Sequence, residues 1–426
     1  MDEYGGYPMV GRRLRRLLWI GLVAGGIVAA ALLWVRVEGE RRLDEVERQV
    51  ARRLGPTDLA AIERPPVPEG DNAALHYVEA GHLLDRTPES RHILRQAGRR
   101  PPGTWTPDEV VRLREAVARH RPALEALAAT AADPGSRRDW QLPDRPVTPM
   151  LLVLDVARLL AAETRLAAHD GDPERAARAL AQLRRLTEGL YDGQALILGL
   201  PVERISLGAL RDALAAGLPL PAQPDRLLAR TDPRRAHRRA MAGELAEELA
   251  AARRPGGALE MLTGTDFHPP WRWAFRLAGP WMIADYQHLR LAAVAADDEP
   301  YPQVMARVEA AAPPWVAYWP KGMPWSVDHG LLAARATLAS RQLAVLALEA
   351  SARATAPAGD QGGDPGALPT APPDPLVGGP LAVERRADGS LLLAYPAALR
   401  SLPDGADHLA DLLQWEVPAP GPWKVH

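Results

Sequence analysis

Residues 17–35 read LLWIGLVAGGIVAAALLWV and contain no charged side chain. As a helix rising about 1.5 Å per residue, this stretch spans roughly 28 Å, close to the thickness of a bilayer's hydrocarbon core. Trp19 and Trp34 lie near its two ends, where indole rings prefer the headgroup boundary. The pattern predicts a transmembrane helix at residues 17–35, preceded by a short cytoplasmic tail at residues 1–16.

A cleavable signal peptide is the main alternative to a retained anchor. The tail carries four arginines just before the apolar run, and Ala29–Ala31 offer a small-residue cleavage site. The run continues to Val35, which is long for a signal-peptide core and favours retention. Six arginines also follow the run, but they alternate with acids, whereas the short tail is tightly basic. The positive-inside rule then predicts a single-pass protein of the bacterial inner membrane, with its bulk periplasmic or extracytoplasmic.

Small residues recur every four positions inside the apolar run, at Gly21, Gly25 and Ala29. This spacing lets two membrane helices approach closely, so it predicts a face for self-association. The alternative is that Gly and Ala are simply frequent in membrane helices. A homo-oligomer or a protein partner is therefore expected, together with the membrane itself.

Composition excludes several classes of function. The formal net charge is −2, which gives no reason to expect nucleic-acid binding. The chain has no cysteine, so disulfides, thiolate nucleophiles and cysteine-ligated metals are absent. Arg far outnumbers Lys in an Ala- and Pro-rich chain, which indicates a GC-rich bacterial genome. We expect no cofactor.

The rest of the chain divides by composition into a mainly α architecture. Leu43, Val46, Val50 and Leu54 form one apolar stripe, which predicts a helix that continues from the membrane and packs on a partner helix or on the body of the protein. The predicted segments are a juxtamembrane helix (36–63), a linker (64–72), a helical domain (73–355), a Pro/Gly linker (356–375) and a small β-containing module (376–426).

The helical domain is predicted to be an irregular antiparallel array. The expected helices are 73–85, 107–132, 149–169, 173–191, 194–216, 233–253, 272–296, 300–311 and 328–355. Residues 171–186, GDPERAARALAQLRRL, resemble the second-helix opening of tetratricopeptide-like hairpins. No fixed repeat of 33 to 47 residues holds along the chain, so such hairpins remain one option for the array.

The C-terminal module carries a hairpin signal. Two short segments, 381–385 (LAVER) and 391–395 (LLLAY), flank Asp388-Gly389, a dipeptide typical of tight hairpin turns. The segment Leu412–Val417 is expected to add either a short helix or a third strand.

The order of motifs in this module supports a resemblance. Asp374-Pro375, Gly379-Pro380-Leu381, the Asp388-Gly389 hairpin, residues 404–407 (DGAD), residues 410–412 (ADL) and Trp415 follow one another. This order resembles the C-terminus of the major pseudopilin of type II secretion systems. Similar tails, with a front end like residues 69–80 (EGDNAALHYVEA), occur in an uncharacterised family of bacterial single-pass membrane-anchored helical proteins.

The resemblance breaks at two places. No prepilin-type cleavage site precedes the apolar run, so the chain is not a pilin. The pseudopilin tail implies a calcium loop, but its glycines are largely replaced in this chain. Asp404, Asp407 and Asp411 remain as weak candidates for a hard cation, and a solvated helix start is the favoured reading of these three acids. We therefore expect no metal.

Aromatic residues are concentrated between positions 266 and 329. Clustered Trp and Tyr in Pro-rich loops can bind a sugar ring or a partner protein, and they can also contact a membrane interface. The favoured reading is an aromatic core that fills gaps between Ala-rich helices. The candidate binding residues are Trp271, Trp273, Trp281, Trp315, Trp319, Trp325, His268 and His288.

No recognised catalytic or cofactor motif occurs in the chain. Acid–acid and acid–histidine pairs such as Glu244/Glu248 and Asp285/His288 occur one helical turn apart, and each is expected to be structural. The sequence therefore favours a non-catalytic envelope protein whose helical domain is a protein-interaction or assembly scaffold. An envelope hydrolase or glycan-binding protein using residues 266–329, and an accessory of a secretion or pilus-like assembly, are the alternatives.

Overall fold

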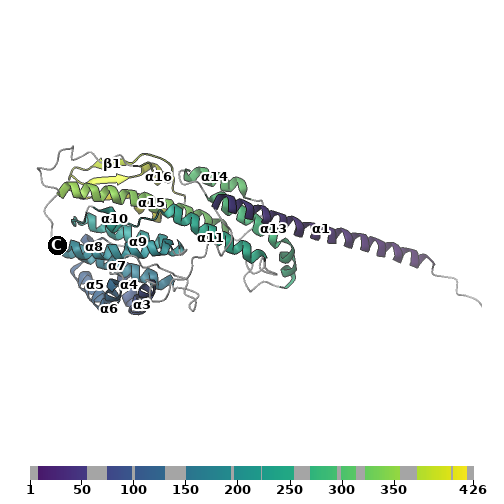
Figure 1. The fold of residues 1–426 in the computed structure, drawn as a ribbon, viewed down its shortest axis with the longest axis horizontal. Coiled ribbons are helices and arrows are strands. Elements are labelled where there is room, and N and C mark those ends of the chain that lie inside the picture. The colour runs from purple at the N-terminus through teal and green to yellow at the C-terminus, as the bar shows by residue number, and fades with distance from the viewer. Residues whose placement is uncertain are drawn as a thin grey trace, which may run out of the picture. The chain divides into compact units, whose positions relative to one another are not determined.

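The computed structural model describes a mainly helical chain with a small antiparallel sheet near its C-terminus (Figure 1). The described residues are 8–54, 74–97, 101–129, 150–192, 196–221, 223–253, 269–294, 299–312, 322–355, 372–403 and 406–419. They form two compact units. Unit 1 comprises Met1–Glu63, Met241–Ala292 and Val308–Tyr318, and unit 2 comprises Arg64–Ala240, Ala293–Arg307 and Trp319–His426. The units thus cut across the linear order of the chain.

Unit 1 is built on one long helix. Helix α1, Pro8–Leu54, runs unbroken through the apolar stretch and the stripe that follows it. It packs with the part of α11 (Pro233–Arg253) that starts at Met241 and with α13 (Pro269–Ala293). The predicted stripe is confirmed as a packing face. Its shared core consists of Leu43, Val46, Val50, Leu245, Leu249, Ala252, Ile283, Ala284 and Leu291, with Leu54 at the edge.

The leading part of α1 packs against almost nothing. Leu17, Leu22 and Ile27 are each at least 64% exposed, and the helix first reaches full burial at Gly39. By length and composition, residues 15–54 qualify as a candidate membrane span, with none of the most apolar window buried. A second candidate, Gly330–Arg353, has 83% of its window buried and is a core helix of unit 2.

Unit 2 is centred on four long helices. These are α7 (Met150–Asp170), α8 (Pro173–Asp192), α9 (Leu196–Ala215) and α15 (Gly322–Thr355). Helices α7 and α8 form a hairpin whose turn needs a positive φ, supplied by Gly171 at 72°. Shorter elements contact this group: α3 (Ala74–His82), α4 (Pro88–Ala97), η2 (Pro102–Thr104), α5 (Pro107–Arg119) and α10 (Pro224–Leu227). Helix α6 (Arg121–Ala129) packs on α3 and α5, and α14 (Tyr301–Ala311) is divided between the two units.

Helix α5 shows both a confirmed and a wrong prediction. The expected start at residue 107 is confirmed, with Thr106 forming a complete capping box with Glu109 and Pro107 in the first turn. The single helix expected over 107–132 is instead two helices that break at His120. The His120 ring is fully buried and its Nδ1 lies 2.6 Å from the Ala116 carbonyl oxygen. Pro122, two residues further on, has no backbone N–H with which to continue the hydrogen bonds of α5, and it is the sequence signal for this break.

The C-terminal module is a three-stranded sheet in the order β1-β2-β3. The predicted hairpin is confirmed as β1 (Ala382–Arg385) and β2 (Leu391–Ala394), and the predicted third strand is β3 (Gln414–Val417). Short helices α16 (Pro396–Arg400) and η5 (Asp407–Leu412) join β2 to β3. The sheet packs on α15, where Trp415 Nε1 donates to Ser340 Oγ at 3.2 Å.

Candidate functional site

The predicted aromatic site is described only in part. Trp281 is half-buried and His288 is exposed. Trp271, Trp273 and Trp325 lie in helices whose side chains are not described at those positions. His268, Trp315 and Trp319 lie outside the described residues.

Trp281 is a junction between α1 and α13. Its ring lies 5.5 Å from the Trp34 ring in an edge-to-face arrangement, and the Arg42 guanidinium lies 4.2 Å above it. Its Nε1 donates to Asp285 Oδ2 at 3.1 Å, and Arg42 Nη1 donates to Asp285 Oδ1 at 2.9 Å. Because these partners occupy the ring's edge and face, Trp281 packs helices together and is not an open platform for a sugar.

The close approach of the two helices requires a glycine at position 39. A Cβ built there would lie 2.8 Å from the Trp281 backbone nitrogen and 3.2 Å from Pro280 Cβ. No side chain fits in that space without movement of α13. Gly39 was not singled out from the sequence, because a glycine beside a membrane span carries no signal of what it touches.

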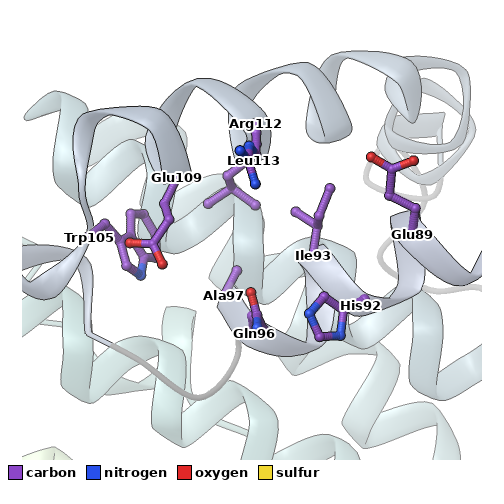
Figure 2. A pocket seen from close by; sticks show the side chains of 9 residues that line it. All are labelled: Glu89, His92, Ile93, Gln96, Ala97, Trp105, Glu109, Arg112 and Leu113. Atoms are coloured by element: carbon purple, nitrogen blue, oxygen red, sulfur yellow. The ribbon is translucent and has the colours of Figure 1, made fainter.

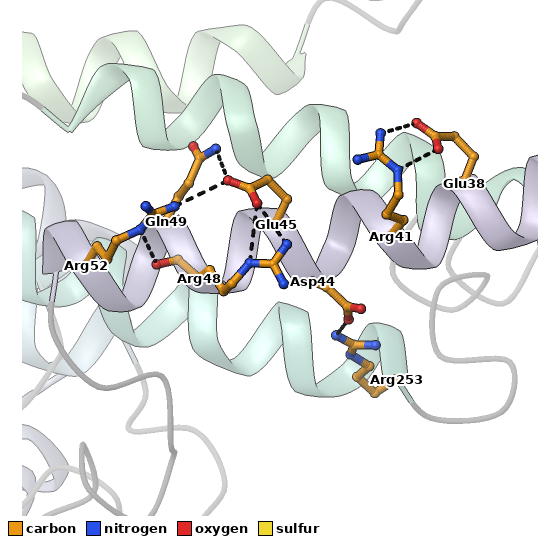
Figure 3. A network of polar contacts seen from close by, with 8 residues as sticks. All are labelled: Glu38, Arg41, Asp44, Glu45, Arg48, Gln49, Arg52 and Arg253. Atoms are coloured by element: carbon orange, nitrogen blue, oxygen red, sulfur yellow. Dashed lines mark hydrogen bonds and ion pairs between the residues drawn. The ribbon is translucent and has the colours of Figure 1, made fainter.

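A charged surface follows the apolar part of α1 (Figure 3). Glu38 accepts two 2.7 Å hydrogen bonds from Arg41, while Glu45 accepts bonds from Gln49 and Arg48. Hydrogen bonds from Arg41 and Arg42 lower the pKa of Glu38 to about 2, and those from Gln49 and Arg48 lower the pKa of Glu45 to about 2.

This surface is also tied to α11. Arg253, at the end of α11, donates a hydrogen bond to Asp44 of α1 (Figure 3). It also pairs with Glu47 of α1 at 2.9 Å. All three side chains are close to half exposed, so each pair contributes about 0–1 kcal/mol. The apolar seam, rather than these pairs, holds α1 to α11.

The predicted association face of α1 is open. A Cβ added at Gly21 or Gly25 would meet nothing within 4 Å, and Ala29 is exposed. Within the described part of unit 1, no other helix covers these positions. Self-association through this face stays a prediction.

The acid candidates for metal binding are described only in part. Asp404 lies outside the described residues, and the side chain of Asp407 is not described. Asp411 is exposed, and its backbone carbonyl accepts a 2.7 Å bond from Arg211. Across the described ranges, no group of three or more His, Asp or Glu side chains is arranged to hold an ion.

The acid pairs of unit 1 hold arginines. Glu244 and Glu248, one turn apart on α11, both bind Arg290 of α13, which is 4% exposed. Asp285 accepts hydrogen bonds from Arg42 and Trp281, while His288 on the next turn is exposed. The Glu244/Glu248 and Asp285 carboxylates thus have the structural roles expected from the sequence.

Unit 2 contains a buried ionic cluster that the sequence does not indicate. Glu203 of α9 accepts from Arg341 Nε of α15 at 2.7 Å and from the Tyr191 hydroxyl of α8. Arg341 also donates to the Thr231 carbonyl at 2.8 Å. Burial raises the pKa of both Tyr191 and Glu203. The cluster joins residues 138 positions apart and fastens three helices of the unit.

A groove lies between α4 and α5 of unit 2 (Figure 2). Its volume is about 310 Å³, and its apolar lining is Ile93, Ala97, Trp105 and Leu113. The Trp105 ring stacks beside His169 of α7 with ring centres 6.3 Å apart, which fixes the indole. The polar lining residues are Glu89, His92, Gln96, Glu109 and Arg112.

The groove was not predicted, because α4 was missed. The segment Pro88–Ala97 is short and has few apolar residues, although Ile93, Leu94 and Ala97 share one face of the helix. Trp105, placed between Pro102 and Pro107, was the available signal, since a Trp in a Pro-rich loop often marks a contact surface.

Comparison with known proteins adds no relative. No family model, no curated protein and no solved structure matches the chain.

Proposed function

We propose that the chain is a single-pass membrane protein whose extracytoplasmic helical body is a protein-interaction scaffold. The observation that carries the proposal is the exposure of α1 between residues 15 and 37, where every residue is exposed except the half-buried Leu32 and Val35. A helix this apolar and this bare costs about 25 cal/mol per Å² of apolar surface left in water. A bilayer removes that cost.

The orientation proposed is N-terminus in the cytoplasm and body in the periplasm or outside the cell. It rests on the tight arginine cluster of the tail. Self-association through Gly21, Gly25 and Ala29, and a tetratricopeptide-like character of the α7–α8 hairpin, belong to the same proposal. Stacked helical hairpins of that kind present long surfaces to protein partners.

The groove between α4 and α5 is the proposed partner site. Its volume is at the lower limit of a small-ligand pocket, and its apolar residues are surrounded by charged side chains. That lining suits one or two apolar side chains of a partner protein, with polar contacts at the rim.

The anchor is tested by replacing Ala24 and Ile27 with Arg in the full chain. Each arginine at the centre of a span costs about 2.5–3.5 kcal/mol of insertion free energy. We expect the wild-type chain to stay in membranes after alkaline carbonate extraction and the double variant to be released. An equal number of arginines placed at exposed positions of α5, such as Val111, is the control. Release of the wild-type chain would refute the anchor.

The orientation and the partner site can be tested on the same cysteine-free background. Val111→Cys, which is 52% exposed, should react with an impermeant maleimide added outside intact cells. A photo-crosslinking residue at Ile93, in the groove, should give a discrete adduct that the same residue at Val111 does not. Equal adduct patterns at both positions would remove the groove from the proposal.

A further inference from the structure

Helices α1 and α13 run in the same direction. Gly39 lies against Pro280 and Trp281, and Arg42 bonds Asp285. Farther along both helices, Val50 and Leu291 belong to one apolar cluster. Residue numbers therefore rise together along the two helices, and the part of α13 before Trp281 extends toward the exposed apolar part of α1.

Along α1, the contact with Trp281 lies at the end of the apolar stretch. Val35 is the last uncharged residue of the run and Arg36 is the first charge after it. Trp34 is 60% exposed and its ring contacts Trp281. Two indoles at the apolar-to-charged transition, with Arg42 and Asp285 beside them, have the composition of a bilayer's headgroup boundary.

The helical segment before the junction is unusual in composition. Residues 269–280 read PPWRWAFRLAGP, with three aromatic residues, two arginines and no acid. As a helix this segment is about 18 Å long. Arg272 and Arg276 are one turn apart and so share one face of the helix. Aromatic residues combined with an arginine face are the chemistry of helices that lie in a membrane interface.

We propose that residues 269–280 of α13 form an interfacial helix that binds anionic phospholipid at the membrane surface beside α1. The proposal rests on the membrane anchor of the proposed function. Arginine near an anionic surface gains about 1 kcal/mol per residue, and the aromatic residues occupy the headgroup–acyl boundary. The Gly39–Trp281 contact and the Arg42–Asp285 pair then fix unit 1 at one depth relative to the bilayer.

The absence of native cysteine permits a direct test by site-directed spin labelling of the full chain. Single-cysteine variants Leu22→Cys, Ala274→Cys and Arg48→Cys are labelled with a nitroxide and placed in nanodiscs of phosphatidylcholine and phosphatidylglycerol. Accessibility to oxygen and to a water-soluble nickel chelate gives the depth of each label. We expect the label at 22 deep in hydrocarbon, the label at 274 about 5–10 Å below the surface and the label at 48 in water.

The outcomes separate the two proposals. If the label at 274 is as aqueous as the label at 48 while the label at 22 is deep, the interfacial helix is refuted and the anchor stands. If the label at 22 is also aqueous, both fail. If the label at 274 is shielded from both reagents and couples magnetically to a second labelled chain, this segment binds another copy and the lipid proposal is overturned.

A charge-reversal variant tests the lipid chemistry. Arg272→Glu combined with Arg276→Glu should move the label at 274 toward water in anionic nanodiscs, and the label at 22 should stay deep. In nanodiscs of phosphatidylcholine alone the reversal should change the depth at 274 much less. An equal shift in both lipids would show that anionic headgroups do not hold the helix.

Discussion

Replacement of Gly39 by Ala is the sharpest test of the α1–α13 junction. The new Cβ would lie 2.8 Å from the Trp281 backbone nitrogen, whereas ordinary contacts begin at 3.4 Å, so the helices must separate by about 0.6 Å (3.4 − 2.8). Overpacking of this kind costs about 1–3 kcal/mol, while removing a glycine from a helix interior gains about 0.5–1 kcal/mol. We expect a net loss of about 1 kcal/mol in the free energy of unfolding.

Gly26→Ala is the matched control for this change. It makes the same substitution in the same helix, at a position where a Cβ meets nothing within 4 Å. Thermal unfolding of the full chain in detergent, followed by circular dichroism, should show a midpoint for Gly39→Ala roughly 2–4 °C below wild type. The midpoint of Gly26→Ala should be unchanged or raised. A midpoint for Gly39→Ala that equals or exceeds that of Gly26→Ala would refute the close packing.

Three further predictions concern the buried Glu203–Arg341 pair, the acids of α1 and the core residue Trp415. Glu203→Gln leaves the buried Arg341 guanidinium without its counter-charge and should lower the free energy of unfolding by about 3–5 kcal/mol. Changing Arg341 to Met in the same variant should restore part of that loss. An unchanged thermal midpoint in Glu203→Gln would contradict the cluster. Glu38 and Glu45 have pKa values near 2 in the folded chain and 4.5 otherwise, so their stabilisation is present above pH 4.5 and is lost as pH falls toward 2. Thermal midpoints measured from pH 6 to pH 2.5 should therefore fall less in the Glu38→Gln, Glu45→Gln double variant than in wild type. Trp415→Ala empties a fully buried site between the sheet and α15 and should lower stability by about 3–5 kcal/mol, whereas Val383→Ala on the exposed face of β1 should have little effect.

Local signals in the sequence were enough to predict most elements. The helix at 233–253 was located to the residue, because apolar periodicity and Pro233 mark it clearly. The hairpin around Asp388-Gly389 was predicted because Gly389 supplies the positive φ of 84° that its turn requires. The seam at Leu43, Val46 and Val50 was predicted because a stripe at spacings of three and four must be covered.

The missed features depend on contacts between distant residues. Glu203 and Arg341 form a pair only because α9 and α15 lie side by side, and nothing near either residue indicates it. Position 39 requires a glycine only because the Trp281 backbone nitrogen lies close to it. The groove at Trp105 required α4, a ten-residue helix with few apolar residues. The resemblance of the tail to a pseudopilin, with the accessory role in secretion that it implies, stays a prediction.

The unbroken course of α1 has a mechanical consequence. Its apolar stretch and its seam with α11 and α13 belong to one rod without a proline or a turn between Pro8 and Leu54. A hinge between the apolar stretch and the seam would let the two parts reorient separately, and α1 has none. Under the proposed membrane anchor, a twist or push on the apolar end of this rod would therefore be passed directly to the parts of α11 and α13 that share its core.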